Sequence, residues 1–125
     1  MGIRCLIVDD SSAFLAAAEL ALSSQGISVV GVAHDSAQAM DKMDALRPDV
    51  ILVDVYLGAE SGFALAERIA ATARSGGRPV HVILISSHAR DEMAELLQDS
   101  PAVAFVDKAE LSAQTIRGAL EHTSA

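Results

Sequence analysis

Val50-Ile51-Leu52-Val53-Asp54 is a run of apolar, mostly β-branched residues that ends in an acid. The run is continuous rather than alternating, which is typical of a strand covered on both faces, as in a parallel sheet. Similar runs occupy residues 3–8, 80–85 and 102–106, while 27–33 is more mixed and typical of an edge strand. The sequence therefore predicts five strands in a sheet with two covered faces.

Segments with helical spacing separate these runs and follow the last one. They cover residues 12–24, 36–46, 62–74, 90–98 and 111–122. Gly26 is a suitable left-handed terminator for the first helix, and the residue before Pro48 should leave the helical region. Asp35 or Ser36 can cap the second helix and Ser61 the third. These signals support the predicted helix boundaries.

The alternation of strand and helix gives right-handed crossovers and a parallel sheet. We therefore predict one flavodoxin-like, doubly wound α/β domain over residues 1–125, with a five-stranded parallel sheet of order 2-1-3-4-5 and five helices. A length of 125 residues is that of one domain, and 51% apolar residues are enough for a core.

Composition excludes several functions. The net charge of −8 argues against nucleic-acid binding, which requires a basic face. No apolar run approaches the roughly 18 residues of a membrane span, and the N-terminus turns acidic too soon for a signal peptide. We expect a cytoplasmic protein without membrane contact. The single cysteine, Cys5, lies in an apolar run and is interpreted as a small buried hydrophobic residue.

Polar side chains follow four of the predicted strands. They are Asp9, Asp10, Asp54, Ser86, Ser87, Asp107 and Lys108. The carboxyl ends of parallel strands share one edge, and ligands bind there beside the point where strand order reverses. In the order 2-1-3-4-5 this point lies between the first and third strands, so the three acids Asp9, Asp10 and Asp54 should converge.

Converging carboxylates need a counter-charge. Two charges 4 Å apart repel by about 4 kcal/mol at an effective dielectric of 20, so either a pKa rises or a cation binds. Oxygen ligands suit Mg²⁺. A carboxylate such as Asp54 can also attack phosphorus, while Lys108 and the Ser86 hydroxyl or Ser87 backbone N–H bind the other phosphoryl oxygens. Each residue alone has a structural explanation, as a turn, cap or surface residue, but together they indicate one site.

Over essentially its whole length the chain resembles the receiver domain of two-component response regulators. The resemblance is carried by Asp9-Asp10, Asp54, Ser86 and Lys108 at the strand ends, and by Gly62 eight residues after Asp54. It implies that Asp54 is the phosphoacceptor. It also implies that Mg²⁺ binds Asp10 directly, Asp9 through water, and Asp54 together with the backbone carbonyl of Tyr56.

The resemblance further implies a switch. Ser86 and Lys108 would bind the phosphoryl oxygens, and Phe105 would turn inward on activation. The face formed by residues 90–98, 102–106 and 111–122 would then signal a downstream protein or an output domain absent from this sequence, and it is a candidate dimer contact. The implied phosphodonor is a sensor histidine kinase or phosphotransfer protein. The chain would be its own substrate, with slow self-dephosphorylation, rather than an enzyme.

The sequence departs from the family pattern at three positions. Ala109 stands where proline usually follows the lysine, and a non-proline cis bond costs about 2.5–4 kcal/mol, so Lys108–Ala109 should be trans. Gly58 also replaces a common proline, which predicts a looser loop after Asp54. Phe105 lacks the hydroxyl of the usual tyrosine. Phe14 and Phe63 are interpreted as core residues on apolar helix faces.

Other functions remain as alternatives. A phosphorylation-independent pseudo-receiver has this fold but is expected to lack the acceptor, the metal acids or the lysine, and all are present here. Haloacid dehalogenase-like hydrolases carry a second aspartate two residues after the nucleophile, whereas Ser11 and Ser12 occupy those positions. A flavin carrier lacks support because aromatics make up only 3% of the chain, and no nucleotide-binding glycine motif occurs.

Overall fold

The computed structural model describes residues 2–87 and 99–123 and contains a five-stranded parallel sheet of order β2-β1-β3-β6-β7. The strands are β1 (Arg4–Val8), β2 (Ser28–Ala33), β3 (Val50–Asp54), β6 (His81–Ser86) and β7 (Ala104–Asp107). In chain order they are the first to fifth strands of the sheet, so the predicted order 2-1-3-4-5 is confirmed. The mixed strand β2 lies at an edge, as expected.

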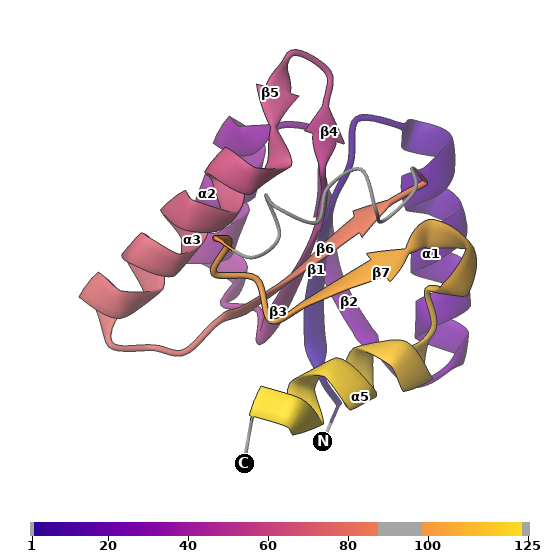
Figure 1. The fold of residues 1–125 in the computed structure, drawn as a ribbon. Coiled ribbons are helices and arrows are strands. Elements are labelled where there is room, and N and C mark those ends of the chain that lie inside the picture. The colour runs from indigo at the N-terminus through magenta and orange to yellow at the C-terminus, as the bar shows by residue number, and fades with distance from the viewer. Residues whose placement is uncertain (1, 88–98, 124–125) are drawn as a thin grey trace.

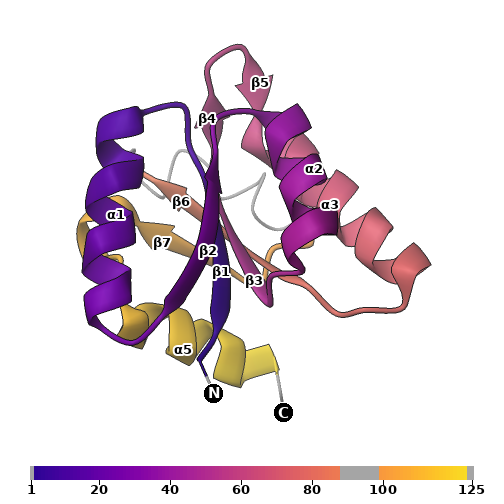
Figure 2. The same ribbon diagram turned by 180° about the vertical axis from the view of Figure 1, so that it is seen from behind.

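Helices cover both faces of the sheet. They are α1 (Ser12–Ser24), α2 (Ser36–Leu46), α3 (Gly62–Gly76) and α5 (Ala113–Thr123). Figures 1 and 2 show α1 and α5 on one face of the sheet and α2 and α3 on the other. The predicted helix over 90–98 lies outside the described residues. Among the helices that the structure describes, none is long and apolar enough to cross a membrane.

The doubly wound arrangement buries two apolar clusters, one on each side of the sheet. Successive strand residues point to opposite faces; Ile51 packs with Leu65 and Ile69, whereas Leu52 packs with the cluster under α1 and α5. Burying one such side chain contributes roughly 1.5–3 kcal/mol. Cys5 is fully buried, and burial raises the pKa of its thiol to about 12, which confirms its interpretation as a hydrophobic residue.

The helix ends agree with the sequence signals. Asp35 is the N-cap of α2 and accepts a hydrogen bond from Gln38 N at 2.8 Å, and Ser61 is the N-cap of α3. Gly26 has a φ of +94° after α1. Arg47, the residue before Pro48, ends α2 with a φ of +51°. Local chemistry therefore fixes where these helices start and stop.

A small hairpin follows β3 and was not predicted. It pairs β4 (Tyr56–Leu57) with β5 (Glu60–Ser61) in antiparallel orientation, and Figure 1 shows it projecting beyond the sheet. Gly58 has a φ of +61° at the first position of the two-residue turn, a conformation that glycine supplies in type II′ hairpin turns. Glycine therefore forms a defined turn here, and the prediction of a looser loop than one with proline stays a prediction.

Two side chains tie this hairpin to the rest of the molecule. Leu57 is 3% exposed and belongs to the cluster under α2 and α3. Glu60 Oε1 accepts a hydrogen bond at 2.9 Å from the backbone N–H of Ser36, the first residue of α2. A carboxylate at a helix N-terminus interacts favourably with the helix dipole. The segment after Asp54 is therefore attached both to the core and to α2.

Candidate metal and phosphoryl site

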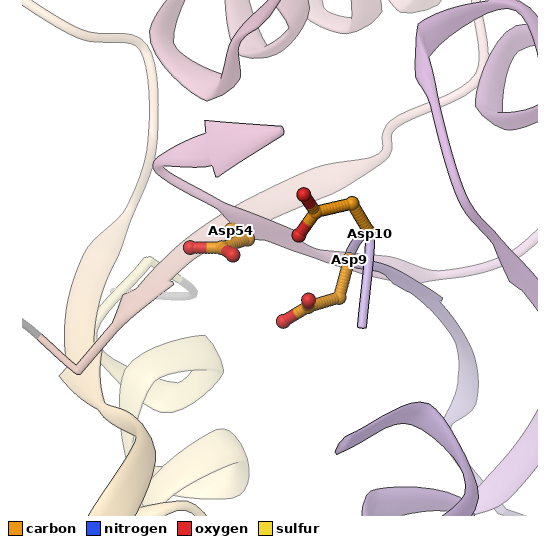
Figure 3. Close-up of side chains that lie close together, drawn as sticks. All are labelled: Asp9, Asp10 and Asp54. Carbon is orange, nitrogen blue, oxygen red and sulfur yellow. The ribbon is translucent and has the colours of Figure 1, made fainter. Parts of the chain in front are cut away.

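Three carboxylates meet at the carboxyl edge of the sheet. Asp9 and Asp10 follow β1, and Asp54 ends the adjacent strand β3, where Val8 is paired with Val53. One carboxylate oxygen from each acid lies within 4.8 Å of the other two. Figure 3 shows the three side chains next to one another. The convergence predicted from the strand order is therefore present.

The three acids differ in exposure. Asp9 is fully buried, Asp54 is 6% exposed, and Asp10 is exposed. Asp9 Oδ1 accepts a hydrogen bond from Ser11 N at 2.8 Å. Asp9 Oδ2 is buried, and among the described residues no donor reaches it with good hydrogen-bond geometry. Because a buried charge is costly without a partner, this oxygen needs a nearby cation, and Lys108 Nζ lies 2.6 Å from it.

Lys108 supplies the positive charge of the site. It follows β7 as the first residue of the 3₁₀ helix η2 (Lys108–Glu110). Its Nζ lies 2.6 Å from Asp9 Oδ2 and 3.3 Å from Asp54 Oδ2. Asp107 caps η2 by accepting a hydrogen bond from Ala109 N at 2.9 Å. No cis peptide occurs in the described part of the chain, so the predicted trans bond before Ala109 is confirmed.

The electrostatics of the site follow from this shared ammonium group. Burial, followed by the charge of Asp9, raises the pKa of Asp54, although Lys108 and the N–H of Tyr56 act in the opposite direction. Burial alone would lower the pKa of Lys108, but contact with Asp9 and the charge of Asp54 raise it above its ordinary value. Lys108 therefore stays protonated, while the carboxylates remain under-compensated.

The other predicted site residues lie at or near the same edge. Ser86 ends β6, is fully buried and is paired with Asp107 of β7. Ser87 follows it and is exposed. Tyr56 is 50% exposed, and its N–H donates to Asp54 Oδ1 at 3.3 Å. Phe105 is 9% exposed and belongs to the cluster under α2 and α3, so its ring is already buried in this structure.

Gly62 sets how closely the segment after Asp54 returns to the strand. Its N–H donates to Val55 O at 2.8 Å. A Cβ at this position would lie 2.0 Å from the carbonyl oxygen of Asp54. The backbone of the first turn of α3 thus packs directly on the backbone of the predicted acceptor, which only glycine permits.

The donor set fits a divalent metal. Three carboxylates offer oxygen ligands that lie within 4.8 Å of one another. Mg²⁺ typically binds one or two carboxylates and keeps several waters, and the exposure of Asp10 leaves the cluster open to solvent. Asp9, Asp10 and Asp54 are therefore the residues that could hold such an ion.

One residue of the site was missed by sequence reasoning. Phe14, interpreted as core, is half-buried, and its ring centroid lies 4.3 Å from Lys108 Nζ. Phe14 lies in the first turn of α1 and Lys108 after the last strand. The helical pattern identifies the apolar face of α1, but it contains no signal that would indicate a lysine from the far end of the chain as a neighbour.

A doubly wound parallel sheet with an acidic cluster and a lysine at its carboxyl edge defines the class of protein. The family model described as the response regulator receiver domain matches residues 5–121. The chain belongs to the response regulator receiver domain family.

Individual relatives agree with this assignment. The chain is 37% identical over 107 residues to a protein-glutamate methylesterase/protein-glutamine glutaminase of Symbiobacterium thermophilum, covering 84% of this chain and 28% of that protein. A similarly named protein of Myxococcus xanthus (strain DK1622) is 34% identical over 107 residues, with 85% and 30% covered. The chain thus spans about a third of the length of the curated relatives that it matches.

Solved structures show the same fold. The signal receiver domain of the putative response regulator NarL from Mycobacterium tuberculosis has a TM-score of 0.75 at 30% identity, covering 99% of this chain and 98% of that chain. The response regulator domain of Thermotoga maritima CheB has a TM-score of 0.72 at 29% identity, with 99% and 92% covered.

Proposed function

We propose that Asp54 accepts a phosphoryl group from a phosphohistidine on a sensor histidine kinase or phosphotransfer protein. The observation that carries this proposal is the meeting of Asp9, Asp10 and Asp54 with Lys108, whose Nζ lies within 3.3 Å of two of the carboxylates. A carboxylate nucleophile, a cluster of metal-ligating oxygens and a fixed ammonium group are the parts that phosphoryl transfer requires.

In the proposed transfer, an oxygen of the ionised Asp54 carboxylate forms a bond to phosphorus as the bond from phosphorus to the donor imidazole nitrogen breaks. The electron pair stays on that nitrogen, which takes a proton from solvent. Lys108 binds one equatorial oxygen, and the Ser86 hydroxyl or Ser87 backbone N–H binds another. Asp9, Asp10, Asp54 and the backbone carbonyl of Tyr56 would hold Mg²⁺, which when bound would neutralise charge on the transferring group.

The proposed output follows from the new charge. A phosphoryl group adds roughly −1.5 to −2 charges and strong acceptor oxygens, to which the buried Ser86 would respond at the end of β6. Phe105 lies beside β6, with Leu84 as its partner in β7–β6 pairing. We propose that a movement of Ser86 and Phe105 changes the conformation of one face of the domain. That face includes β7 and α5, together with residues 90–98 outside the described part. That face would contact an output domain, a separate protein or a second copy.

We also propose that residues 1–125 act as the receiver unit and that any enzymatic output resides elsewhere. The curated relatives are named as methylesterases, and the chain matches about a third of them. The chain's own chemistry would then be limited to accepting the phosphoryl group and losing it slowly to water.

The deciding experiment is intact-mass spectrometry after incubation with acetyl phosphate and Mg²⁺. Wild-type protein should gain one phosphate, and Asp54→Asn should gain none. Omission of Mg²⁺ should reduce incorporation strongly in the wild type. Equal incorporation in Asp54→Asn, or none in a folded wild-type protein, would refute the proposal.

A further inference from the structure

The phenyl ring of Phe14 contacts the ammonium group at the centre of the site. Lys108 Nζ lies 4.3 Å from the ring centroid. A cation within about 6 Å of an aromatic face is attracted by the ring quadrupole, most strongly where water is partly excluded. The Lys108 side chain is only 18% exposed, so the ring acts on an ammonium group that has lost much of its hydration.

The first turn of α1 fixes this ring relative to Asp9. Ser11 N donates to Asp9 Oδ1 at 2.8 Å, and Ser11 Oγ, the N-cap of α1, accepts from Phe14 N at 3.2 Å. Asp9 Oδ2 in turn lies 2.6 Å from Lys108 Nζ. The contacts form a closed circuit through Asp9, Ser11, Phe14 and Lys108. The Asp9 carboxylate and the Phe14 ring are thus fixed by the same short turn, and both contact the ammonium group of Lys108.

We propose that Phe14 is a positioning residue for Lys108, an inference that rests on the function proposed for Asp54. Lysine has a flexible stem, and two carboxylates compete for its ammonium group. During transfer Lys108 must redirect an N–H from a carboxylate to a phosphoryl oxygen. The ring contact needs no directed hydrogen bond, so it can hold Nζ in place while its N–H partners change.

The contact can be tested without phosphorylation. The chain has two lysines, Lys42 and Lys108, so ε-¹³C-lysine labelling gives two ε-CH₂ signals that Lys42→Arg assigns. We expect the ring current of Phe14 to displace the Lys108 signal in the wild type and in Phe14→Tyr. Phe14→Leu should remove the displacement. Phe63→Leu, which removes another half-buried ring on α3, should not. An unchanged Lys108 signal in Phe14→Leu would refute the contact.

The functional test compares two ligands. Phe14→Leu should slow phosphorylation by acetyl phosphate, and weaken binding of the phosphoryl mimic beryllofluoride at saturating Mg²⁺, by between about 2-fold and about 30-fold, the range of a cation–π contact. Mg²⁺ affinity measured without the mimic should stay unchanged. Phe14→Tyr, which keeps an aromatic ring, should keep the wild-type phosphorylation rate and beryllofluoride affinity. Phe63→Leu should behave as wild type.

Two results of the functional test would also overturn the proposal. One is a Phe14→Leu protein that is phosphorylated at the wild-type rate. The other is an equal loss of Mg²⁺ affinity in this variant, which would indicate general damage to the site. Failure of the proposed function looks different: wild-type protein would show the displaced Lys108 signal but take no phosphate, so the contact would stand while its role in transfer would fall.

Discussion

The charged side chains are balanced differently at the two edges of the sheet, the amino edge where the parallel strands begin and the carboxyl edge where they end. At the amino edge, Arg78 pairs with Asp49 at 3.7 Å, and both Arg4 and Arg78 donate hydrogen bonds to carbonyl groups at the end of α2. Cations near a helix C-terminus interact favourably with the helix dipole. Each of these arginines therefore has acceptors that match its charge.

The carboxyl edge has an excess of negative charge instead. Asp9, Asp10 and Asp54 cluster there, and Lys108 is the cation that contacts two of them. We expect this excess of negative charge to lower the stability of the metal-free protein and to favour binding of a cation. The amino edge therefore pairs its charges within the fold, whereas the carboxyl edge carries the excess negative charge that the proposed metal site would use.

The largest expected effect is a loss of stability on substitution of Gly62, the glycine at the start of α3. Gly62→Ala should destabilise the protein by about 3 kcal/mol or more, the upper range for overpacking, because its Cβ would lie 2.0 Å from the backbone oxygen of Asp54. Urea unfolding measures this loss, and phosphate incorporation should fall as Asp54 shifts.

Gly76 at the other end of the same helix is the matched control. A Cβ there meets nothing within 4 Å, so Gly76→Ala should leave stability and phosphorylation nearly unchanged. Equal stability of the two variants would show that the close approach of Gly62 to the backbone of Asp54 does not exist.

Metal binding should be the next largest effect, and it should distinguish the two edges. Mg²⁺ at one hundred times its Kd adds about 2.7 kcal/mol to the free energy of unfolding. The melting temperature should therefore rise with Mg²⁺ in the wild type. Asp10→Asn should weaken this response, whereas Asp49→Asn at the amino edge should keep it. A response that is lost equally in both variants would contradict a localised site.

Much of the fold was predictable because its signals are local. The bounds of α1 and α2 match the prediction, since each combines helical spacing with a capping residue, Ser11 or Asp35. The convergence of Asp9, Asp10 and Asp54 followed from strand order, which places the ends of adjacent parallel strands side by side.

What could not be predicted depends on short elements or distant contacts. Strands of two residues, as in the hairpin around Gly58, are too short to show a period, although a glycine at the first turn position was an available signal. The contact of Phe14 with Lys108 depends on how α1 packs against the turn after β7. Its only sequence sign is an aromatic residue on a helix face, which is equally typical of a core.

A smaller effect on the free energy of unfolding is expected when pH is varied in the metal-free protein. Burial and the charge of Asp9 raise the pKa of Asp54, so the folded state binds this proton more tightly than the unfolded state. The stability contributed by protonated Asp54 is full below the unfolded value of about 3.9 and is lost as pH rises through the folded pKa.

The comparison with Asp54→Asn, which cannot titrate, tests this sign. Relative to that variant, metal-free wild-type protein should become less stable as pH rises from about 4, and Mg²⁺ should reverse the loss. Denaturant titrations from acidic to neutral pH measure it. A wild type that instead gains stability over the variant would mean that Lys108 over-compensates the carboxylates.

The smallest effect should come from the ion pair at the amino edge. The side chains of Arg78 and Asp49 are 39% and 49% exposed and lie 3.7 Å apart, and solvent-exposed pairs of this kind contribute roughly 0.2–1 kcal/mol. A double-mutant cycle of Arg78→Ala and Asp49→Asn in urea should give a coupling energy in this range that decreases with added salt. The same cycle for Lys108→Ala and Asp9→Asn should give a larger and less salt-sensitive coupling, since Asp9 is buried. Equal couplings at the two edges would remove the distinction between them, because the charges at both edges would then be equally screened by water.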